Sequence, residues 1–272
     1  MIKGIDISHY QGNINFTKVK ADGYEFVFIK ATEGNNYKDP MFETNFNNAK
    51  AAGLKVGAYH FGRFESIADA KAEAQFFLQT VKGKTFSYPV VLDLEVDKYN
   101  LTDKTLTDAT IAFLETLENA GYFAMLYSGK YFLENELEDE RLKPYALWVA
   151  RYAKELGRDA GIWQYSSKGT VDGIAGNVDV DIAYYDYSFV SPKGAKVETV
   201  KVQAKAPKAK PCPKSGIVKA TLLNVRKGPG TNYAIIGTLK KGKPVKIAKG
   251  VSGWYSIYFG NHGGWVSSQY IK

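Results

Sequence analysis

The sequence lacks the residues and segments on which several classes of protein depend. It has one cysteine, Cys212, and three histidines scattered over 272 residues. No intrachain disulfide or cysteine-based zinc cage can therefore form, and we expect no metal centre and no cofactor. No run of 18 apolar residues occurs, so we expect no membrane insertion. Asp6 and His9 fall where a secretory signal needs its apolar stretch, and we expect no signal peptide.

Signatures of three further chemistries are also missing. Cys212 lies between two prolines in a Lys- and Pro-rich stretch, outside any segment that would hold a Cys–His peptidase site. No glycine-rich phosphate turn follows the first apolar run, and no serine nucleophile elbow is present. These absences argue against thiol peptidases, nucleotide-binding sheets and serine hydrolases.

Carboxylates are absent from the last part of the chain, although the net charge of the whole is only +8. Residues 1–191 contain 20 basic and 27 acidic residues, whereas residues 214–272 contain ten basic residues and no acidic one. A module of this kind is attracted to polyanions, which include nucleic acid, anionic lipid and anionic wall polymers. We expect no nucleic-acid partner, because the basic module shows no recognition helix and the body is acidic.

Short apolar runs alternate with helical patterns through the first 190 residues. The runs cover 2–7, 26–31, 54–61, 89–94, 123–127, 146–149, 162–165 and 178–184, and amphipathic segments cover 40–52, 67–81, 106–119 and 131–137. Alternation of this kind indicates parallel βαβ units. Eight runs predict an α/β fold, an irregular (β/α)8-like barrel, with an open doubly wound sheet as the competing interpretation.

The remainder of the chain predicts a linker and a second domain. Residues 191–214 are rich in Pro, Lys and Ala, which is typical of an exposed, extended linker. Five short strand-like runs follow, at 222–225, 235–239, 245–248, 254–258 and 264–266, separated by tight glycine turns. We therefore expect an α/β domain at 1–190, a linker at 191–214, and a small all-β barrel at 215–272.

The sharpest chemical feature is the Asp93-Leu-Glu95 segment that closes the fourth run. Residues two apart in a strand point to the same side, so the side chains of Asp93 and Glu95 lie on the same face of the strand. Two carboxyl groups in an apolar barrel mouth cannot both ionise freely, and one becomes a candidate general acid. A D-x-E pair can equally be a solvated loop or a salt-bridge partner, and the pair alone does not decide between these.

Other strand ends add to this candidate site. Asp6 and Asp179 would bring further negative charge to the same rim, which suits the positive charge that develops on a sugar during glycoside cleavage. Tyr59, Tyr127, Trp148, Trp163 and Tyr165 offer flat apolar faces for sugar rings, although such aromatics are individually more often core residues. For His60, a structural role in a buried strand is the better interpretation.

Seven segments in order resemble glycoside hydrolase family 25, the Chalaropsis-type lysozymes. They are GIDISHYQG at 4–12, FIKATEG at 28–34, VGAYHF at 56–61, VLDLE at 91–95, LWVARY at 147–152, WQY at 163–165 and GNVD at 176–179. Four segments of the tail, LNVRKGPG at 223–230, IGTL at 236–239, GWY at 253–255 and GWVSSQYI at 264–271, resemble a bacterial SH3 (SH3b) domain. The combination resembles a phage endolysin or a bacterial autolysin.

The resemblance implies hydrolysis of the β-1,4 bond between N-acetylmuramic acid and N-acetylglucosamine in bacterial peptidoglycan. By position, it makes Glu95 the general acid/base, Asp93 the partner carboxylate, and Asp6 and Asp179 the remaining catalytic acids. It implies substrate binding by Tyr59, Tyr127, Trp148, Gln164 and, as a lesser candidate, Asp181. Whether Asp93 stabilises a charged intermediate or orients the acetamido group of the substrate stays open at this stage.

The same resemblance makes the tail a wall-binding module. Its candidate contact residues are Trp254, Tyr255, Tyr258, Trp265 and Tyr270, of which at least half are expected to be core. Its charge adds anionic wall polymers to the expected partners, and we expect the protein to reside in the host bacterial cytoplasm before lysis and to act at the wall. The alternatives are a hydrolase of chitin-like polymers and an inactive wall-binding protein, and four intact acidic positions argue against the latter.

Overall fold

The computed structural model describes residues 1–188, 214–230, 233, 235–251, 253–260 and 263–272. The chain divides into two compact units, Met1–Gly194 and Ala195–Lys272. Most of the expected linker, including Cys212, falls outside the described residues. No helix among the described residues is long and apolar enough to cross a membrane.

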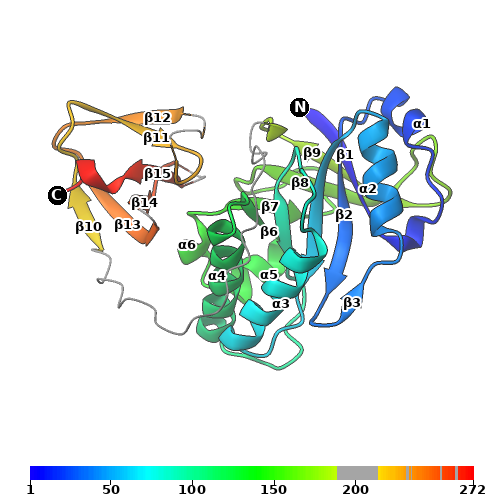
Figure 1. Cartoon of the computed structure of the whole chain (residues 1–272), viewed down its shortest axis with the longest axis horizontal. Coiled ribbons are helices and arrows are strands. Elements are labelled where there is room, and N and C mark those ends of the chain that lie inside the picture. Colours follow the sequence, from blue (N-terminus) through cyan, green and yellow to red (C-terminus); the bar gives the residue numbers. More distant parts are fainter. Residues whose placement is uncertain (189–213, 231–232, 234, 252, 261–262) are drawn as a thin grey trace. The chain divides into compact units, whose positions relative to one another are not determined.

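The first unit is an eight-stranded closed barrel (Figure 1). Its strands are β1 (Ile2–Ile7), β2 (Phe26–Glu33), β4 (Lys55–Phe61), β5 (Val90–Asp93), β6 (Ala124–Gly129), β7 (Ala146–Ala150), β8 (Ile162–Gly169) and β9 (Val178–Ala183). The barrel closes because β1 pairs with both β2 and β9, while the short strand β3 (Tyr37–Lys38) extends β2 as a hairpin. The expected irregular α/β barrel is confirmed.

The helices are fewer and shorter toward the end of the barrel. They are α1 (Phe16–Ala21), α2 (Phe42–Ala51), α3 (Ile67–Thr80), α4 (Asp103–Asn119), α5 (Lys130–Asn135) and α6 (Asp139–Leu142), with a 3-10 turn η1 (His9–Gln11). Figure 1 shows α2, α3 and α4 outside the strands. Serine and threonine side chains begin the two longest helices: Ser66 accepts from the Asp69 backbone N–H, and Thr102 from that of Thr105.

The last strand departs from the expected parallel order. β9 runs antiparallel to both of its neighbours, β8 and β1. Only residues 170–177 connect β8 to β9, and a parallel pair needs a crossover of about a dozen residues or more. The chain therefore returns as a hairpin, and this return sets Asp179 directly opposite Asp6.

Two apolar cores lie on the two faces of the barrel wall. Alternate residues of β2 face opposite ways: Phe26 and Phe28 belong to the inner core, and Val27 and Ile29 to the core shared with the helices. The inner rings fill space that neighbouring strands leave by carrying glycine. A Cβ at Gly4 would lie 2.1 Å from the Phe26 ring, and one at Gly57 would lie 2.4 Å from the Phe28 ring.

The second unit is a six-stranded all-β fold. Its strands are β10 (Ser215–Ile217), β11 (Leu222–Arg226), β12 (Ile235–Lys240), β13 (Pro244–Val251), β14 (Trp254–Ile257) and β15 (Gly264–Ser267), followed by a 3-10 turn η3 (Ser268–Tyr270). The strand pairings among its described residues are all antiparallel, and Val225, Ile257 and Val266 are fully buried at its centre. The expected SH3-like barrel is confirmed, with β10 as a strand that the sequence patterns missed.

Candidate active site

The four expected catalytic acids line one pocket, at the carboxyl ends of the parallel strands and the amino end of the antiparallel strand β9. Asp6 comes from β1, Asp93 and Glu95 from the end of β5, and Asp179 from β9, and the pocket volume is about 300 Å³. Tyr59, Tyr127, Trp148 and Gln164 line the same pocket. Residues far apart in the sequence therefore meet at the mouth of the barrel, where parallel barrels place their active sites.

Asp93 and Glu95 are held by the backbone around them. Leu94, between them, is buried on the helix side; its N–H donates to the Tyr127 carbonyl, and its own carbonyl accepts from Ser128 Oγ at 2.7 Å. With Leu94 fixed outward, both acids turn inward. Asp93 is 5% exposed, whereas Glu95 reaches solvent at the pocket mouth.

The two carboxyl groups lie close enough to interact directly, so they titrate as a coupled pair. Burial raises the pKa of Asp93 well above its ordinary range, and the charge of Glu95 adds to this effect. The pKa of Glu95 is also raised, first by loss of solvent in the pocket and then by the charge of Asp179. The pair thus retains its proton to a higher pH than free carboxyl groups do, which is the property that acid catalysis requires.

A second acidic pair lies deeper, at the junction of β1 and β9. Asp181 is fully buried below the pocket, which it does not line, and its Oδ1 accepts from Trp148 Nε1 at 2.8 Å. Burial raises the pKa of Asp6 and of Asp181 well above the ordinary range. The charges of Asp181 and Asp179 raise the pKa of Asp6 further. In this structure Asp181 supports Trp148 rather than facing a substrate.

Gln164 connects three walls of the pocket. Its Nε2 donates to Asp6 Oδ2 at 2.7 Å, and its Oε1 accepts from the hydroxyl groups of Tyr127 and Tyr152 at 3.0 and 2.8 Å. Because the amide has both a donor and an acceptor end, it fixes a carboxylate on one side and two phenols on the other. Tyr152 was not among the residues that the sequence patterns singled out.

The aromatic residues divide into lining and supporting groups. Trp148 is 1% exposed, and its ring stacks on Phe28 with centroids 4.6 Å apart. Tyr59 and Tyr127 are also buried but turn one edge to the pocket. Trp163 and Tyr165 pack against the core between barrel and helices and do not line this pocket.

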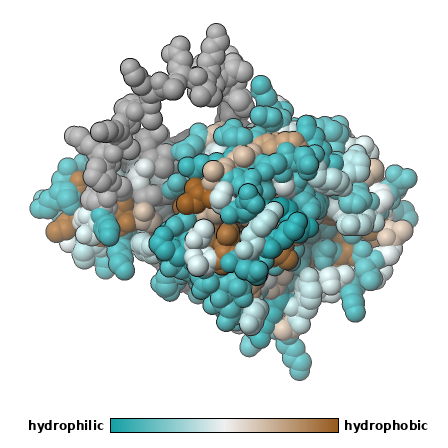
Figure 2. Space-filling model, turned by 90° about the horizontal axis from the view of Figure 1, so that it is seen from below, coloured by the Kyte–Doolittle hydropathy of each residue, from teal (hydrophilic) through white to brown (hydrophobic). Residues whose placement is uncertain are grey.

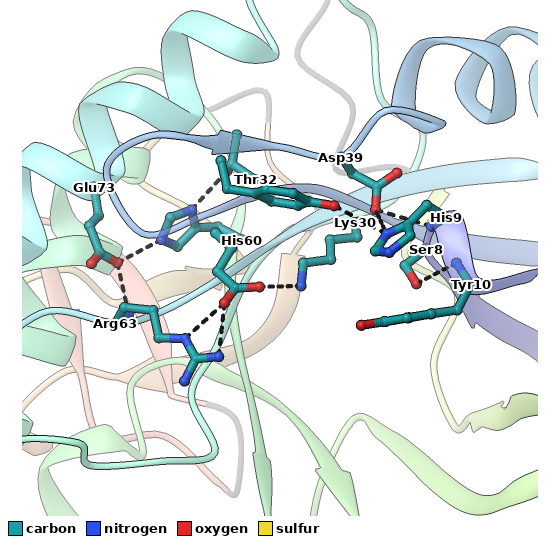
Figure 3. A network of polar contacts seen from close by, with 11 residues as sticks. Ser8, His9, Tyr10, Lys30, Thr32, Asp39, His60, Arg63 and Glu73 are labelled. Atoms are coloured by element: carbon teal, nitrogen blue, oxygen red, sulfur yellow. Dashed lines mark hydrogen bonds and ion pairs between the residues drawn. The ribbon is translucent and has the colours of Figure 1, made fainter.

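Lys30 is a pocket residue that sequence reasoning missed. It is 8% exposed, and among the described residues that line the pocket it is the sole cation. Its ammonium group donates to one carboxylate oxygen of Glu33, and Arg63 donates to the other. Figure 3 shows Lys30 and Arg63 on either side of this carboxylate. Alternation along β2 could have revealed it, since Lys30 shares a face with Phe26 and Phe28.

His60 faces away from this pocket and is satisfied on both ring nitrogens (Figure 3). Nδ1 lies 2.8 Å from Thr32 Oγ1 and Nε2 lies 2.8 Å from Glu73 Oε2. Burial lowers the pKa of His60, so the neutral ring is favoured. Its position is structural. No group of three or more His, Cys, Asp or Glu side chains in the described part of the chain is arranged to hold a metal ion.

In the second unit, the aromatic residues have unequal access to solvent. Trp265 is 3% exposed and belongs to the interior, while Tyr255 packs partly against the core. Trp254 and Tyr270 line a shallow pocket with Leu222 and Asn224, and Tyr258 is 36% exposed elsewhere on the unit. Trp254, Tyr258 and Tyr270 are therefore the aromatics that a ligand could reach.

The raised pKa of Asp93 predicts a pH-dependent stability cost. The native protein binds this proton more tightly than the unfolded chain does, so the free energy of unfolding falls as pH rises above about 3.9 and through the raised native pKa. We expect Asp93→Asn to melt at a higher temperature than wild type at neutral pH and to lose this advantage near pH 4. Asp172→Asn, on an exposed aspartate, is the matched control. A lower melting temperature for Asp93→Asn at neutral pH would contradict the assignment.

Barrel and pocket together define a class of protein. An acidic pocket at the mouth of a parallel-strand barrel, with a coupled D-x-E pair and aromatic walls, is typical of glycoside hydrolases. Comparison with known proteins identifies the family. The model of glycosyl hydrolases family 25 matches residues 5–174, and the chain belongs to this family. The model of the bacterial SH3 domain matches residues 221–272.

Individual relatives support both halves of this result. An autolytic lysozyme of Clostridium acetobutylicum is 36% identical over 183 residues, which is 66% of this chain and 55% of that protein. A D-alanyl-L-alanine endopeptidase of Streptococcus phage B30 is 28% identical over 287 residues, covering 98% of this chain and 63% of its own length. This chain thus spans little more than half of the Clostridium protein.

A solved structure agrees with the barrel. The bacterial lysozyme of Streptomyces coelicolor superposes with a TM-score of 0.64 at 30% identity, covering 70% of this chain and 94% of that one.

Proposed function

We propose that this protein is an N-acetylmuramidase, a lysozyme that hydrolyses the β-1,4 bond from N-acetylmuramic acid to N-acetylglucosamine in peptidoglycan. The observation that carries the proposal is the Asp93–Glu95 pair, which holds a shared proton within an acidic pocket of a family 25 barrel. Glu95 is the general acid because it is the member that reaches the pocket mouth. It protonates the leaving oxygen and later activates the attacking water.

Asp93 acts from the same side of the sugar as Glu95, because the two carboxyl groups hydrogen-bond directly. An inverting enzyme needs about 6.5–9.5 Å between its two carboxyl groups to admit a water, and a carboxylate nucleophile must approach the face opposite the leaving group. Neither requirement fits a pair in direct contact. We therefore propose that Asp93 orients the 2-acetamido group of the substrate, whose oxygen attacks the anomeric carbon, and that configuration is retained.

Asp6 and Asp179 complete the acidic wall. They face each other across the β1–β9 pair, and Gln164 fixes the Asp6 carboxyl. Negative charge here favours the positive charge that develops on the sugar ring in the transition state. Tyr59, Tyr127 and Tyr152 border the space in which that ring would lie.

The experiment that tests this function is digestion of purified Gram-positive peptidoglycan, with reduced products identified by mass spectrometry. Muropeptides with muramic acid at the reducing end would support the muramidase. Reducing-end glucosamine would mean a glucosaminidase on the same barrel, and efficient cleavage of soluble chitin oligomers would favour a chitin-like substrate. New amino groups without new reducing ends would point to the peptidase activity in the name of the phage B30 relative. Wall binding without any product would leave an inactive binder.

We propose further that residues 215–272 hold the enzyme at the wall, joined by a linker at 191–214, and that the protein accumulates in the host bacterial cytoplasm before lysis. Similarity to a protein of a Streptococcus phage supports the second point. Tethering raises the local concentration of the barrel on an insoluble substrate. Trp254, Tyr258 and Tyr270 are the proposed aromatic contacts, and solvent reaches all three.

Anionic wall polymers are the second proposed partner, bound by a basic face around β10. Its exposed lysines are Lys214, Lys219, Lys241, Lys243, Lys246 and Lys272. Backbone pairing brings them together: Ile217 exchanges hydrogen bonds with Lys272, Val218 donates to Lys243, and Ser215 pairs with Lys246. Since residues 214–272 contain no carboxylate, nothing acidic within this stretch offsets that charge.

We expect Lys219→Glu/Lys243→Glu/Lys272→Glu to weaken binding to teichoic-acid-bearing walls on the order of tenfold at low salt and to flatten its salt dependence. Co-sedimentation of the full chain with walls measures this. The control is Lys50→Glu/Lys71→Glu/Lys82→Glu, which gives the same net charge from exposed lysines of the barrel unit. Equal losses of wall binding in the two triple variants would refute a specific basic face. So would an equally large loss of binding on walls from which acid has extracted the teichoic acid.

Among the described residues on the face that Figure 2 shows, no large apolar patch offers an alternative surface for binding the wall. Hydrophilic residues cover most of it, and apolar residues emerge only in small separate patches. Such scattered exposure is ordinary for a folded protein. The proposed wall contacts therefore rest on charge and on the named aromatics.

A further inference from the structure

Lys30 places a buried positive charge at the mouth of the barrel, where it requires an explanation. Phe26 and Phe28 fill the inner core, and Lys30, two residues further along β2, has the same orientation and ends that row. It lines the pocket with Asp6, Asp93, Glu95 and Asp179. A lysine is almost never buried without a partner, because desolvation of the charge is costly.

The ammonium group is fixed from the side away from the pocket. Lys30 Nζ lies 2.6 Å from Glu33 Oε2, and it lies over the rings of Phe61 and Tyr37 at 5.0 and 5.7 Å from their centroids. Arg63 holds the other oxygen of Glu33, with Nε and Nη2 at 2.9 and 2.8 Å (Figure 3). One carboxylate is thus shared by two cations, and the triad of Lys30, Glu33 and Arg63 retains a net charge of +1.

We propose that Lys30 is a positioning residue of the glycosidase reaction: held by Glu33 and Arg63, its charge opposes the negative charge of the pocket and thereby sets the pH range over which the Asp93–Glu95 pair carries one proton. Lys30 itself forms no bond to the sugar. This inference rests on the proposed hydrolase function and deepens it, because it assigns control of the protonation of the acidic pair to a residue outside the acidic set.

The charges around the pair explain why such a residue is needed. Burial raises the pKa of both carboxyl groups, and neighbouring negative charges raise them further, so without an opposing charge the pair would hold its protons to a higher pH. Lys30 is the foremost group that lowers the pKa of Asp93, and it lowers that of Glu95 as well. The other titratable groups that line the pocket are Asp6, Asp179, Tyr10, Tyr59, Tyr127 and Tyr152, and none of them carries a positive charge. The charge of Glu33, which also pairs with Arg63, acts on the pKa of Asp93 in the opposite direction to Lys30 and less strongly.

The test compares Lys30→Met with wild type in the full chain, using pH–rate profiles of peptidoglycan solubilisation. We expect kcat to fall by about ten- to a hundredfold, with KM little changed and both limbs of the profile moved about one unit toward higher pH. Lys30→Arg, which keeps the charge, should restore the position of the limbs even where its rate is lower. Lys98→Met is the matched control, because Lys98 is exposed and does not line the pocket.

Two results would overturn the inference. A loss of rate in Lys30→Met with unmoved limbs would make Lys30 a merely structural residue, and wild-type rate and profile would remove any role. Where the unpaired Glu33 prevents folding, the double variant Lys30→Met/Glu33→Gln removes both members of the ion pair. The limbs of its pH–rate profile should move in the same direction by a smaller amount, because Lys30 affects the pKa of Asp93 more than Glu33 does. If wild type itself releases no saccharide product, the proposed function fails instead, and the two failures are thereby distinguished.

Discussion

Glu95→Gln should lower the rate of peptidoglycan hydrolysis by about 10³–10⁴-fold, at the upper end of what a general acid contributes. The amide has the size of the carboxyl group but carries no proton that it can transfer to the leaving oxygen. Because Glu95 lies at the solvent-facing rim of the pocket, its replacement leaves the packed core intact. Release of soluble muropeptides, followed by mass spectrometry, measures the loss.

Glu65→Gln provides the matched control for this variant. Glu65 is exposed and does not line the pocket. Both variants should bind walls as wild type does, since the basic face and Trp254 are unchanged. A Glu95→Gln protein that retains more than about a tenth of the wild-type rate would remove Glu95 from the role of acid.

Asp93→Asn should lower kcat by about 10²–10³-fold, the effect of removing one preorganised group that acts in the transition state. The asparagine can still hydrogen-bond to Glu95, so the geometry is kept, but the negative charge that orients and stabilises the acetamido group is lost. The same variant is expected to be more stable at neutral pH than wild type. Opposite signs for activity and stability are the mark of a site that is kept under electrostatic strain.

A modified substrate tests the role of Asp93 independently. Peptidoglycan whose muramic acid lacks the N-acetyl group offers no acetamido oxygen, and wild type should cleave it slowly. Asp93→Asn should then lose little further rate on that substrate, because the two changes remove the same interaction. Proton NMR of the first-formed product should show retained configuration. Full additivity of the two losses, or an inverted product, would rule out the acetamido mechanism.

Much of the site follows from local rules of chain geometry. Alternation along a strand is enough to place Asp93 and Glu95 on one side, and the buried Leu94 between them keeps both turned inward. The same rule places Lys30 beside Phe28 on the inner face, although the aromatic and acidic residues drew more notice than a lysine does. The family resemblance of the seven segments and the SH3-like tail required no tertiary structure.

What the sequence by itself determined is therefore the order of the eight barrel strands and of the longer helices, the two-part fold, the family and the acidic pair at the end of β5, all of which depend on neighbours in the chain. Only the tertiary structure decided that β9 returns antiparallel, that Asp179 thereby faces Asp6, that Asp181 lies below the pocket holding Trp148, and that Trp265 is internal. The physical reason is that these positions depend on how distant strands close the barrel and on which side chains fill its interior. Both are long-range packing outcomes that a local pattern does not contain.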